Sequence, residues 1–317
     1  MLWTIEALYV ILIAGELTIG ILGNGFIVLV NCVDWLTKRA ISLVDIILMS
    51  LAISRICLLC VISADGFVMA LFPDIHDSGE LTRILDAVWT LANNLSVWFT
   101  CCLSIFYLLK IANISHPCFL WLKLKINKVI LGILLGSSLV SLVISVSMND
   151  DMWCQFLKTI HEGNITCQFK VSKIPNALKQ ITSNLGAMVP FTLCLISFFL
   201  LLSSLFRHTK QMKLHATGTR DPSTQVHMKA IKAVVIFLLL LILYYAIFLV
   251  MTSSLLIPQG KLVVMIGGVI ALIFPTSHSF ILIMGNSKLR EAFLKVLRSV
   301  KRFHKGGKPL CSIERVS

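Results

Sequence analysis

Residues 233–253 read AVVIFLLLLILYYAIFLVMTS, a run of 21 residues without a charged side chain. A helix of about 20 apolar residues is long enough to cross the hydrocarbon core of a bilayer. The whole chain of 317 residues shares this character, being 57% hydrophobic and only 14% charged. Soluble domains average about 45–50% apolar and about 25% charged residues. The composition therefore excludes a soluble globular enzyme, a disordered chain and a disulfide scaffold.

Similar apolar stretches recur along the chain, and no repeat or low-complexity linker divides it. Seven stretches are long enough to span a bilayer: Ala7–Val33, Leu43–Leu71, Leu85–Leu109, Val129–Met148, Asn184–Phe206, Ala233–Ser253 and Leu262–Met284. We therefore predict an all-α membrane protein, a bundle of seven transmembrane helices. Residues 1–284 would form the transmembrane domain, and residues 285–317 a cytoplasmic amphipathic helix with a basic tail.

The distribution of basic residues predicts the orientation of the chain. An odd number of spans places the two termini on opposite sides of the membrane. With the N-terminus outside, only 6 of the 28 Lys and Arg residues lie in outer segments, whereas 21 lie in inner ones. Because cytoplasmic segments of membrane proteins are enriched in Lys and Arg, we expect an extracellular N-terminus and a cytoplasmic C-terminus. The net charge of +13 is then a property of membrane topology and gives no reason to expect a nucleic-acid partner.

This topology selects among three Asn-x-Ser/Thr sequons. Asn94 lies within the third span and Asn113 in an inner loop, whereas Asn164 lies in the outer loop 149–183. We therefore predict N-glycosylation at Asn164 alone. Cys154 and Cys167 share this loop and its oxidising compartment; a disulfide between them and two free thiols both stay open.

Polar residues inside the spans are unusual, because a charge near the bilayer centre is costly and tends to face the bundle interior. Arg55 lies near the middle of the second span, and Glu16 and Asp65 lie nearer the outer surface. We predict that Arg55 faces the bundle axis and hydrogen-bonds to polar groups of the first and seventh spans, with Asn24 and Ser279 as the candidates. Such a network could act as a static clamp between helices or as a conformational switch.

Other patterns argue against catalysis. The chain has no HExxH, GxSxG or Walker motif and no His or Cys cluster with metal-ligand spacing, so we expect neither enzymatic activity nor a bound metal or cofactor. The seventh span has no Lys for a retinal Schiff base, which excludes an opsin. The GxxxG pattern of Gly132 and Gly136 in the fourth span favours close packing inside the bundle over dimerisation. A transporter or channel for small organic molecules stays open as an alternative.

The C-terminal segment has an amphipathic helical pattern. Its apolar residues recur at helical spacing among basic ones: Leu289, Phe293, Val296, Leu297, Val300 and Phe303. Such a helix lies on the membrane surface, with its basic face toward anionic headgroups. Cys311 follows the helix and could carry a palmitoyl chain or remain a free thiol.

Six segments, in order along nearly the whole chain, resemble the bitter taste receptors, taste receptor type 2. They are Gly15–Gly25, Leu51–Leu58, Leu103–Pro117, Ser204–Met212, Ala216–Thr224 and Pro275–Leu289. The chain also departs from rhodopsin-like receptors as this family does. Phe106-Tyr107-x-x-Lys110 replaces the acidic-Arg-Tyr motif, and Arg55 replaces a sodium-binding aspartate, so we expect no sodium site.

The resemblance implies a G-protein-coupled receptor of the plasma membrane. It would bind bitter small-molecule agonists between its helices on the extracellular side and activate a heterotrimeric G protein of the gustducin type, leading to phospholipase C and calcium signalling. Membrane lipid would be a further partner, and a receptor oligomer stays open.

The family's ligand contacts on the third span correspond to Trp89 and Asn93, which are four residues apart and share one helix face. Tyr244 and Tyr245 of the sixth span and Val264 of the seventh complete the implied pocket. Family receptors often have a polar residue near Val264, so its apolar side chain suggests a ligand set less selective for cations. Two alternatives stay open: Trp89 could be an interfacial anchor, and Tyr245 could face lipid or a neighbouring helix.

For the cytoplasmic side, the resemblance implies that residues at the inner ends of the third and fifth spans take part in coupling to the G protein and in contacts of the inactive state. The residues concerned are Tyr107, Lys110, Ser204, Leu205 and His208. Lys110 could equally be a boundary lysine whose ammonium group reaches the membrane surface.

Overall fold

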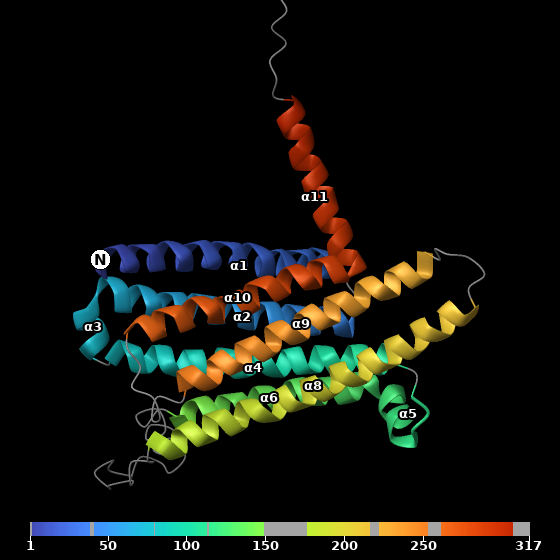
Figure 1. Cartoon of the computed structure of the whole chain (residues 1–317), viewed down its shortest axis with the longest axis horizontal. Coiled ribbons are helices and arrows are strands. Elements are labelled where there is room, and N and C mark those ends of the chain that lie inside the picture. Colours follow the sequence, from blue (N-terminus) through green and yellow to red (C-terminus); the bar gives the residue numbers. More distant parts are fainter. Residues whose placement is uncertain are drawn as a thin grey trace, which may run out of the picture.

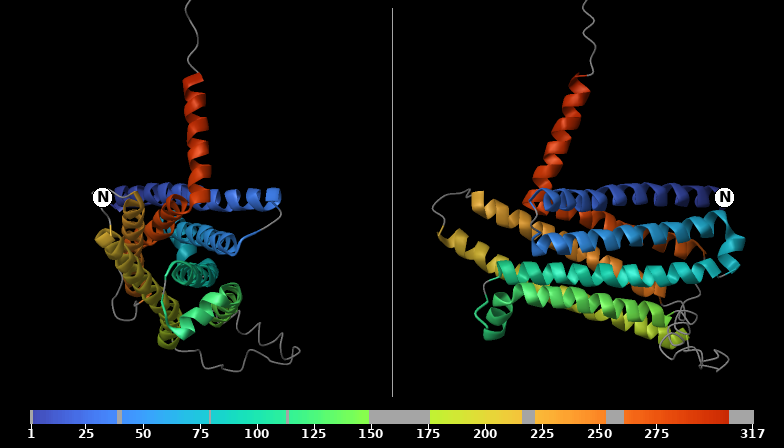
Figure 2. Two further views of the ribbon diagram at one scale, coloured as in Figure 1. Left: turned by 90° about the vertical axis from the view of Figure 1, so that its right-hand side faces the viewer. Right: turned by 180° about the vertical axis from the view of Figure 1, so that it is seen from behind.

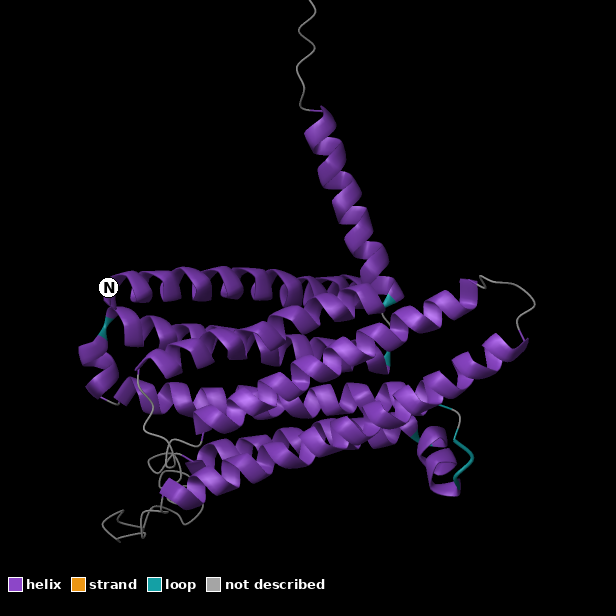
Figure 3. Cartoon of the chain, viewed as in Figure 1, coloured by secondary structure: helices purple, strands orange, loops and turns teal. Residues whose placement is uncertain are grey.

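The computed structural model describes residues 2–38, 41–78, 80–112, 114–148, 176–215, 222–252 and 261–306. These residues are almost entirely helical and include no strand (Figure 3). Asn113, the loop with Cys154, Asn164 and Cys167, and the tail with Cys311 lie outside the described residues.

Seven of the helices are long and apolar enough to cross a membrane. They are α1 (Leu2–Lys38), α2 (Leu43–Leu71), α4 (Glu80–Ile111), α6 (Ile126–Met148), α8 (Asn176–His215), α9 (Pro222–Thr252) and α10 (Lys261–Gly285). Three shorter or surface helices accompany them, namely α3 (Pro73–Ser78), α5 (Pro117–Leu124) and α11 (Ser287–Gly306). The predicted seven-helix fold is confirmed. Most spans are longer than predicted because the helices continue through polar residues beyond the apolar runs.

The seven spans lie side by side and alternate in direction (Figure 1). Helix α3 and the N-terminus lie at one end of the bundle, whereas α5 and the start of α11 lie at the other (Figures 1 and 2). At this second end α8 and α9 extend beyond the other spans. Helix α11 runs crosswise to the spans, as a helix lying on the membrane surface must (Figure 2).

Local sequence signals set several helix ends. The Ser42 hydroxyl and the Asp45 carboxylate form a reciprocal capping box at the start of α2. At the start of α5, His116 accepts a hydrogen bond from the amide of Cys118, and Pro117 occupies the first helical turn, where its missing N–H costs nothing. These caps place polar groups at the membrane boundary, where the chain turns between spans.

Helix α4 lies at the centre of the bundle. It packs against α2, α3, α5, α6 and α8, and two-thirds of its most apolar segment is buried, compared with 17% for α1. The outer faces of the other spans expose large apolar side chains, among them Leu22, Leu139 and Leu239. In water such surfaces would drive aggregation, but in a bilayer they face lipid tails.

Helix α6 contradicts one prediction. Gly132 and Gly136 are exposed, and no atom lies within 4 Å of the position that a Cβ would take on either residue, so the GxxxG pattern does not pack inside the bundle. Helix α6 instead turns three serines inward at intervals of four residues, Ser137, Ser141 and Ser145. The Ser145 hydroxyl donates to the Ala87 carbonyl of α4 over 2.7 Å. This serine face fixes the rotation of the helix and leaves both glycines outside.

Two glycines permit the close contact of α1 with α10. A Cβ on Gly20 would come within 2.8 Å of the Thr276 hydroxyl, and one on Gly23 would collide with the Ser279 hydroxyl. The Asn24 amide adds a hydrogen bond of 3.3 Å to the Pro275 carbonyl. Small residues let membrane helices approach closely enough for such bonds.

We predict that Gly23→Leu lowers the free energy of unfolding by about 1–3 kcal/mol, since overpacking a close helix contact costs that much. The measurement is the thermal unfolding midpoint of the purified protein in detergent. Gly15→Leu is the matched control, because Gly15 is exposed on the same helix and has no neighbour within 4 Å of a Cβ. Equal midpoints for the two variants would contradict this account of the contact.

Candidate functional site

An aromatic cluster joins α4, α8 and α9 in the half of the bundle nearer the N-terminus. The Trp89 ring stacks on Phe248 with 6.0 Å between ring centroids. Tyr245 stacks on Phe191 at 4.0 Å and on Phe248 at 5.6 Å. Trp89 is half-buried and Tyr245 is 5% exposed, so both rings face neighbouring helices. Of the two arrangements left open for Tyr245, the structure places it against α8.

Polar groups lie beside these rings. The Tyr244 hydroxyl donates a hydrogen bond to the side-chain oxygen of Asn93, and both residues are buried. The Tyr245 hydroxyl is also buried but has no hydrogen-bond partner. Buried hydroxyl groups normally find a partner, so this hydroxyl is free to bind a polar atom of a ligand.

The structure brings together four of the five residues implied for ligand binding: Trp89, Asn93, Tyr244 and Tyr245. Val264 instead packs in another cluster, with Tyr9, Ile13 and Leu59 of α1 and α2. Phe191 and Phe248 were not predicted. Phe248 could have been found by its spacing, since it lies three and four residues after the two tyrosines on the same helix. Phe191 follows a proline in another span and carries no such signal.

Arg55 lies at the middle of the bundle and is completely buried, as predicted, but its predicted partners are wrong. Its Nη2 atom donates to the Thr100 hydroxyl of α4 over 3.1 Å and to Nδ1 of His278 on α10. Asn24 instead donates to the carbonyls of Gly20 and Pro275.

The correction has a simple physical reason. Ser279 turns its hydroxyl back to the Thr276 carbonyl within its own helix, a bond that serines in helices commonly make. His278, one residue earlier, therefore supplies the acceptor on α10. The network still joins the second and seventh spans, but its third member is α4 and not α1.

The residues implied for signalling lie at the opposite end. Tyr107 and Leu205 pack in one core cluster with Leu108 and Ile231, which joins α4, α8 and α9. Lys110 is exposed, and its ammonium group lies 5.4 Å from the centroid of the Phe106 ring. Ser204 is half-buried and His208 is exposed on the same helix as Leu205. The five residues therefore occupy neighbouring ends of α4 and α8, although only Tyr107 and Leu205 share a packed core.

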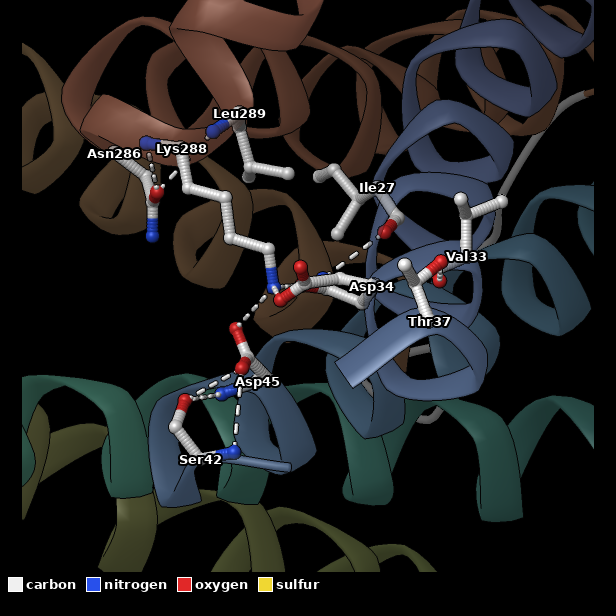
Figure 4. Close-up of polar contacts among 10 residues, drawn as sticks. Ile27, Val33, Asp34, Thr37, Ser42, Asp45, Asn286, Lys288 and Leu289 are labelled. Carbon is white, nitrogen blue, oxygen red and sulfur yellow. Dashed lines mark hydrogen bonds and ion pairs between the residues drawn. The ribbon is translucent and has the colours of Figure 1, made fainter. Parts of the chain in front are cut away.

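A second polar network at this end was missed. Lys288 of α11 donates to Asn31 over 2.9 Å and to Asp45 over 3.0 Å, and forms an ion pair of 2.7 Å with Asp34 (Figure 4). An ammonium group has three N–H bonds, and each one here has an acceptor. Asn286 accepts from the amide groups of Lys288 and the following residue and so caps the helix. The sequence signal was the presence of two acidic residues beside an inner loop that is otherwise basic.

Burial lowers the pKa of Lys288, but its hydrogen bonds to Asp34 and Asp45 and the charges of the two carboxylates raise it by more, so the net direction is upward from 10.5. A raised lysine pKa contributes stability that is complete below the pKa of the unfolded chain and is lost only as pH rises through the folded value. The ammonium group therefore stays charged, and the network stays intact on the lysine side, at every physiological pH.

A bundle of seven membrane-spanning helices, with aromatic and polar side chains between its helices and a basic helix across one end, is the architecture of a seven-helix membrane receptor. The chain belongs to the taste receptor family: the family model described as taste receptor protein (TAS2R) matches residues 1–301. This is a receptor family and not an enzyme family, and it leaves the transporter or channel alternative without support. In general terms, a taste receptor binds a ligand and couples to a G protein.

Individual family members are closely similar to this chain over nearly its whole length. Taste receptor type 2 member 9 of Homo sapiens is 74% identical over 305 residues, which cover 96% of this chain and 98% of that protein. The member 9 receptor of Pongo pygmaeus is 74% identical over the same length. Taste receptor type 2 member 7 of Macaca mulatta is 51% identical over 307 residues, with 96% of each chain covered.

We predict that Lys288→Met lowers the free energy of unfolding by about 1.5–3 kcal/mol, because hydrogen bonds to charged groups contribute that much. The matched control is Lys295→Met on the same helix. Lys295 pairs with Glu291 at 3.0 Å, but both side chains are about 70% exposed, and such a pair contributes only about 0.3–0.5 kcal/mol. Thermal unfolding of the purified protein measures both. If Lys295→Met lowers the unfolding midpoint as much as Lys288→Met does, the Lys288 network contributes no stability of its own.

Proposed function

We propose that this receptor binds bitter small molecules in the outer half of the bundle and activates a heterotrimeric G protein of the gustducin type. Activation would lead to phospholipase C and calcium signalling. The observation that carries the ligand site is the set of aromatic rings stacked on Tyr245, whose buried hydroxyl has no partner. Ligand sites in helix bundles combine apolar and aromatic walls with a few polar groups that fix the ligand's orientation.

Each proposed ligand contact has a distinct role. Trp89 offers a ring face to an aromatic or cationic group. The Tyr245 hydroxyl offers a hydrogen-bond donor or acceptor. Asn93 and Tyr244 already bond to each other, so they stabilise the wall of the proposed pocket. Their hydrogen bond would break only when a ligand competes for it. Val264 packs outside this cluster, and we keep it as an outer contact only.

We predict that Trp89→Ala weakens agonist potency about tenfold or more, because a lost aromatic stack costs about 0.5–1.5 kcal/mol beyond the lost apolar area, and 1.4 kcal/mol corresponds to a factor of ten. The measurement is agonist-evoked calcium release in cells that express the receptor and a matched G protein, with a panel of bitter compounds as agonists.

Val88→Ala is the control, since Val88 neighbours Trp89 on α4 but is 44% exposed on the outer face. Tyr245→Phe keeps the ring and should weaken only those agonists that bond to the hydroxyl. Unchanged potency in Trp89→Ala would place the ring outside the ligand site. Agonist-evoked uptake or current that needs no G protein would reject the receptor mechanism itself.

For the cytoplasmic side, we propose that Tyr107, Lys110, Ser204, Leu205 and His208 form the contacts that change on coupling. Their position at neighbouring ends of α4 and α8 supports this role, as does the extension of α8 and α9 beyond the bundle at the same end (Figure 1). Tyr107 and Leu205 would transmit helix movement through their shared core. Lys110 is exposed and would contact the G protein directly.

We predict that Lys110→Ala reduces the maximal calcium response about two- to fivefold at unchanged surface expression, because an exposed charged contact contributes about 0.2–1 kcal/mol. Lys128→Ala provides the control, since Lys128 is an exposed lysine at the same end of the bundle. A full response in Lys110→Ala would show that Lys110 is a membrane-boundary residue without a role in coupling.

We further propose that the receptor resides in the plasma membrane with its N-terminus outside, that residues 1–284 form the receptor domain and that residues 285–317 are cytoplasmic. The separation of the N-terminus from α5 and α11 along the bundle supports opposite sides for the two termini. Membrane lipid would contact the exposed apolar side chains of α11, such as Val296 and Val300. A receptor oligomer stays open; Gly132 and Gly136 face outward on α6, and no described residue covers them.

The proposed orientation places Asn164 in the lumen during synthesis. We predict that Asn164→Gln removes a glycan and increases the gel mobility of the protein, whereas Asn113→Gln, in an inner loop, leaves it unchanged. Digestion with a glycosidase should remove the difference between wild type and Asn164→Gln. A shift caused by the Asn113 change instead would invert the proposed topology.

A further inference from the structure

Arg55 is the only arginine or lysine within the described spans that is completely buried, with 0% of its surface exposed. It lies near the middle of α2. Its side chain contacts Thr100 of α4 and His278 of α10, and the guanidinium carbon lies 5.3 Å from the centroid of the Phe274 ring. Three helices therefore meet at a single cation.

The hydrogen bonds of this cation are incomplete. A guanidinium group has five N–H bonds. The two bonds of Nη2 are used by Thr100 and His278, whereas Nε and Nη1 are buried and have no partner. Buried polar groups are nearly always hydrogen-bonded, since an unsatisfied donor is costly and a charged one more so. Three N–H bonds of Arg55 thus lack an acceptor.

The charge of this cation is also unbalanced. The Thr100 hydroxyl and the Phe274 ring are neutral. His278 accepts through Nδ1, so its imidazole must be neutral, with its proton on the other nitrogen. No carboxylate forms an ion pair with Arg55 among the residues that the structure describes. An arginine does not lose its proton in proteins, and a buried charge needs a partner of opposite sign.

We propose that Arg55 binds a small inorganic anion, chloride, through the N–H groups of Nε or Nη1. Water could accept these hydrogen bonds, but it would leave the positive charge unbalanced, whereas an anion satisfies both requirements. A monovalent spherical ion suits the site because few donors are free. A phosphate or sulfate would bring two or more negative charges and several acceptor atoms to a single cation.

The proposed anion site borders one of the residues proposed to contact agonists. Phe274, which the guanidinium faces, stacks on Tyr244 at 4.9 Å, and Tyr244 bonds to Asn93. The anion would therefore balance the charge that holds α2, α4 and α10 together, one ring away from the residues proposed to contact agonists. The proposal does not depend on the identity of the agonist, and its test needs none.

The test compares the thermal unfolding midpoint of the purified receptor, without agonist, in sodium chloride, sodium bromide and sodium gluconate at equal concentration. A thiol-reactive dye reports unfolding through the buried thiols of Cys101, Cys102 and Cys194. Because a ligand that binds only the folded state stabilises it by mass action, we expect a rise of about 3–5 °C in chloride or bromide over gluconate. Replacing sodium by choline should not change the rise.

Variants separate Arg55 from the other basic residues. Arg55→Gln should abolish the difference between chloride and gluconate. Arg290→Gln removes a guanidinium from the exposed face of α11. In this variant the difference between chloride and gluconate should persist. If Arg55→Gln does not fold, Arg55→Lys keeps the charge but loses Nε and Nη1, and should reduce the rise by half or more. Equal wild-type midpoints in chloride and gluconate, or an undiminished rise in the recovered Arg55 variant, would overturn the proposal.

Discussion

A peptide group in hydrocarbon that finds no hydrogen-bond partner costs several kcal/mol, so a spanning chain must satisfy its backbone within itself. This constraint dictates the architecture of the molecule. All seven apolar runs form helices that continue until polar residues reach the membrane boundary. Because lipid tails are as apolar as the side chains of the spans, apolar surface alone cannot decide which helix faces meet. The arrangement of the helices therefore depends on small and polar residues between them.

These residues occur at three levels along the bundle. In the half of the bundle nearer the N-terminus, the bond between Tyr244 and Asn93 joins α9 to α4, and aromatic stacks bring in α8. At mid-depth, Arg55 joins α2, α4 and α10. At the end of the bundle where α5 and α11 lie, Lys288 joins α11 to α1 and α2. Each level uses one to three polar contacts in an otherwise apolar interface, where the low dielectric strengthens hydrogen bonds.

The number and approximate positions of the spans could be predicted from sequence because they depend on composition along the chain, which is a local property. The helix ends could not, because the helices continue into the polar residues beyond the apolar runs. The family resemblance likewise follows from short motifs. The partners of Arg55 could not be predicted with the same certainty, because helix rotation decides whether His278 or Ser279 faces the bundle axis, and a serine can satisfy its hydroxyl within its own helix. Helix rotation also explains why the GxxxG pattern is exposed and why Val264 lies apart from the aromatic cluster. The GxxxG pattern of α6 describes one helix alone, whereas the burial of Ser137, Ser141 and Ser145 and the bond from Ser145 to α4 decide which face is buried. The family pattern groups Val264 with the aromatic residues, but its helix turns it toward α1 and α2.

The position of the Lys288 network divides the end of the bundle where α11 lies into two parts. Its acceptors all belong to α1 and α2, whereas the helices that extend beyond the bundle at that end are α8 and α9. Helices α8 and α9 can therefore tilt or slide without breaking any bond of this network to the membrane-surface helix. The receptor thus has a frame made of α1, α2 and α11 and tied together by one ammonium group, and a movement of α8 and α9 relative to this frame would leave that tie intact.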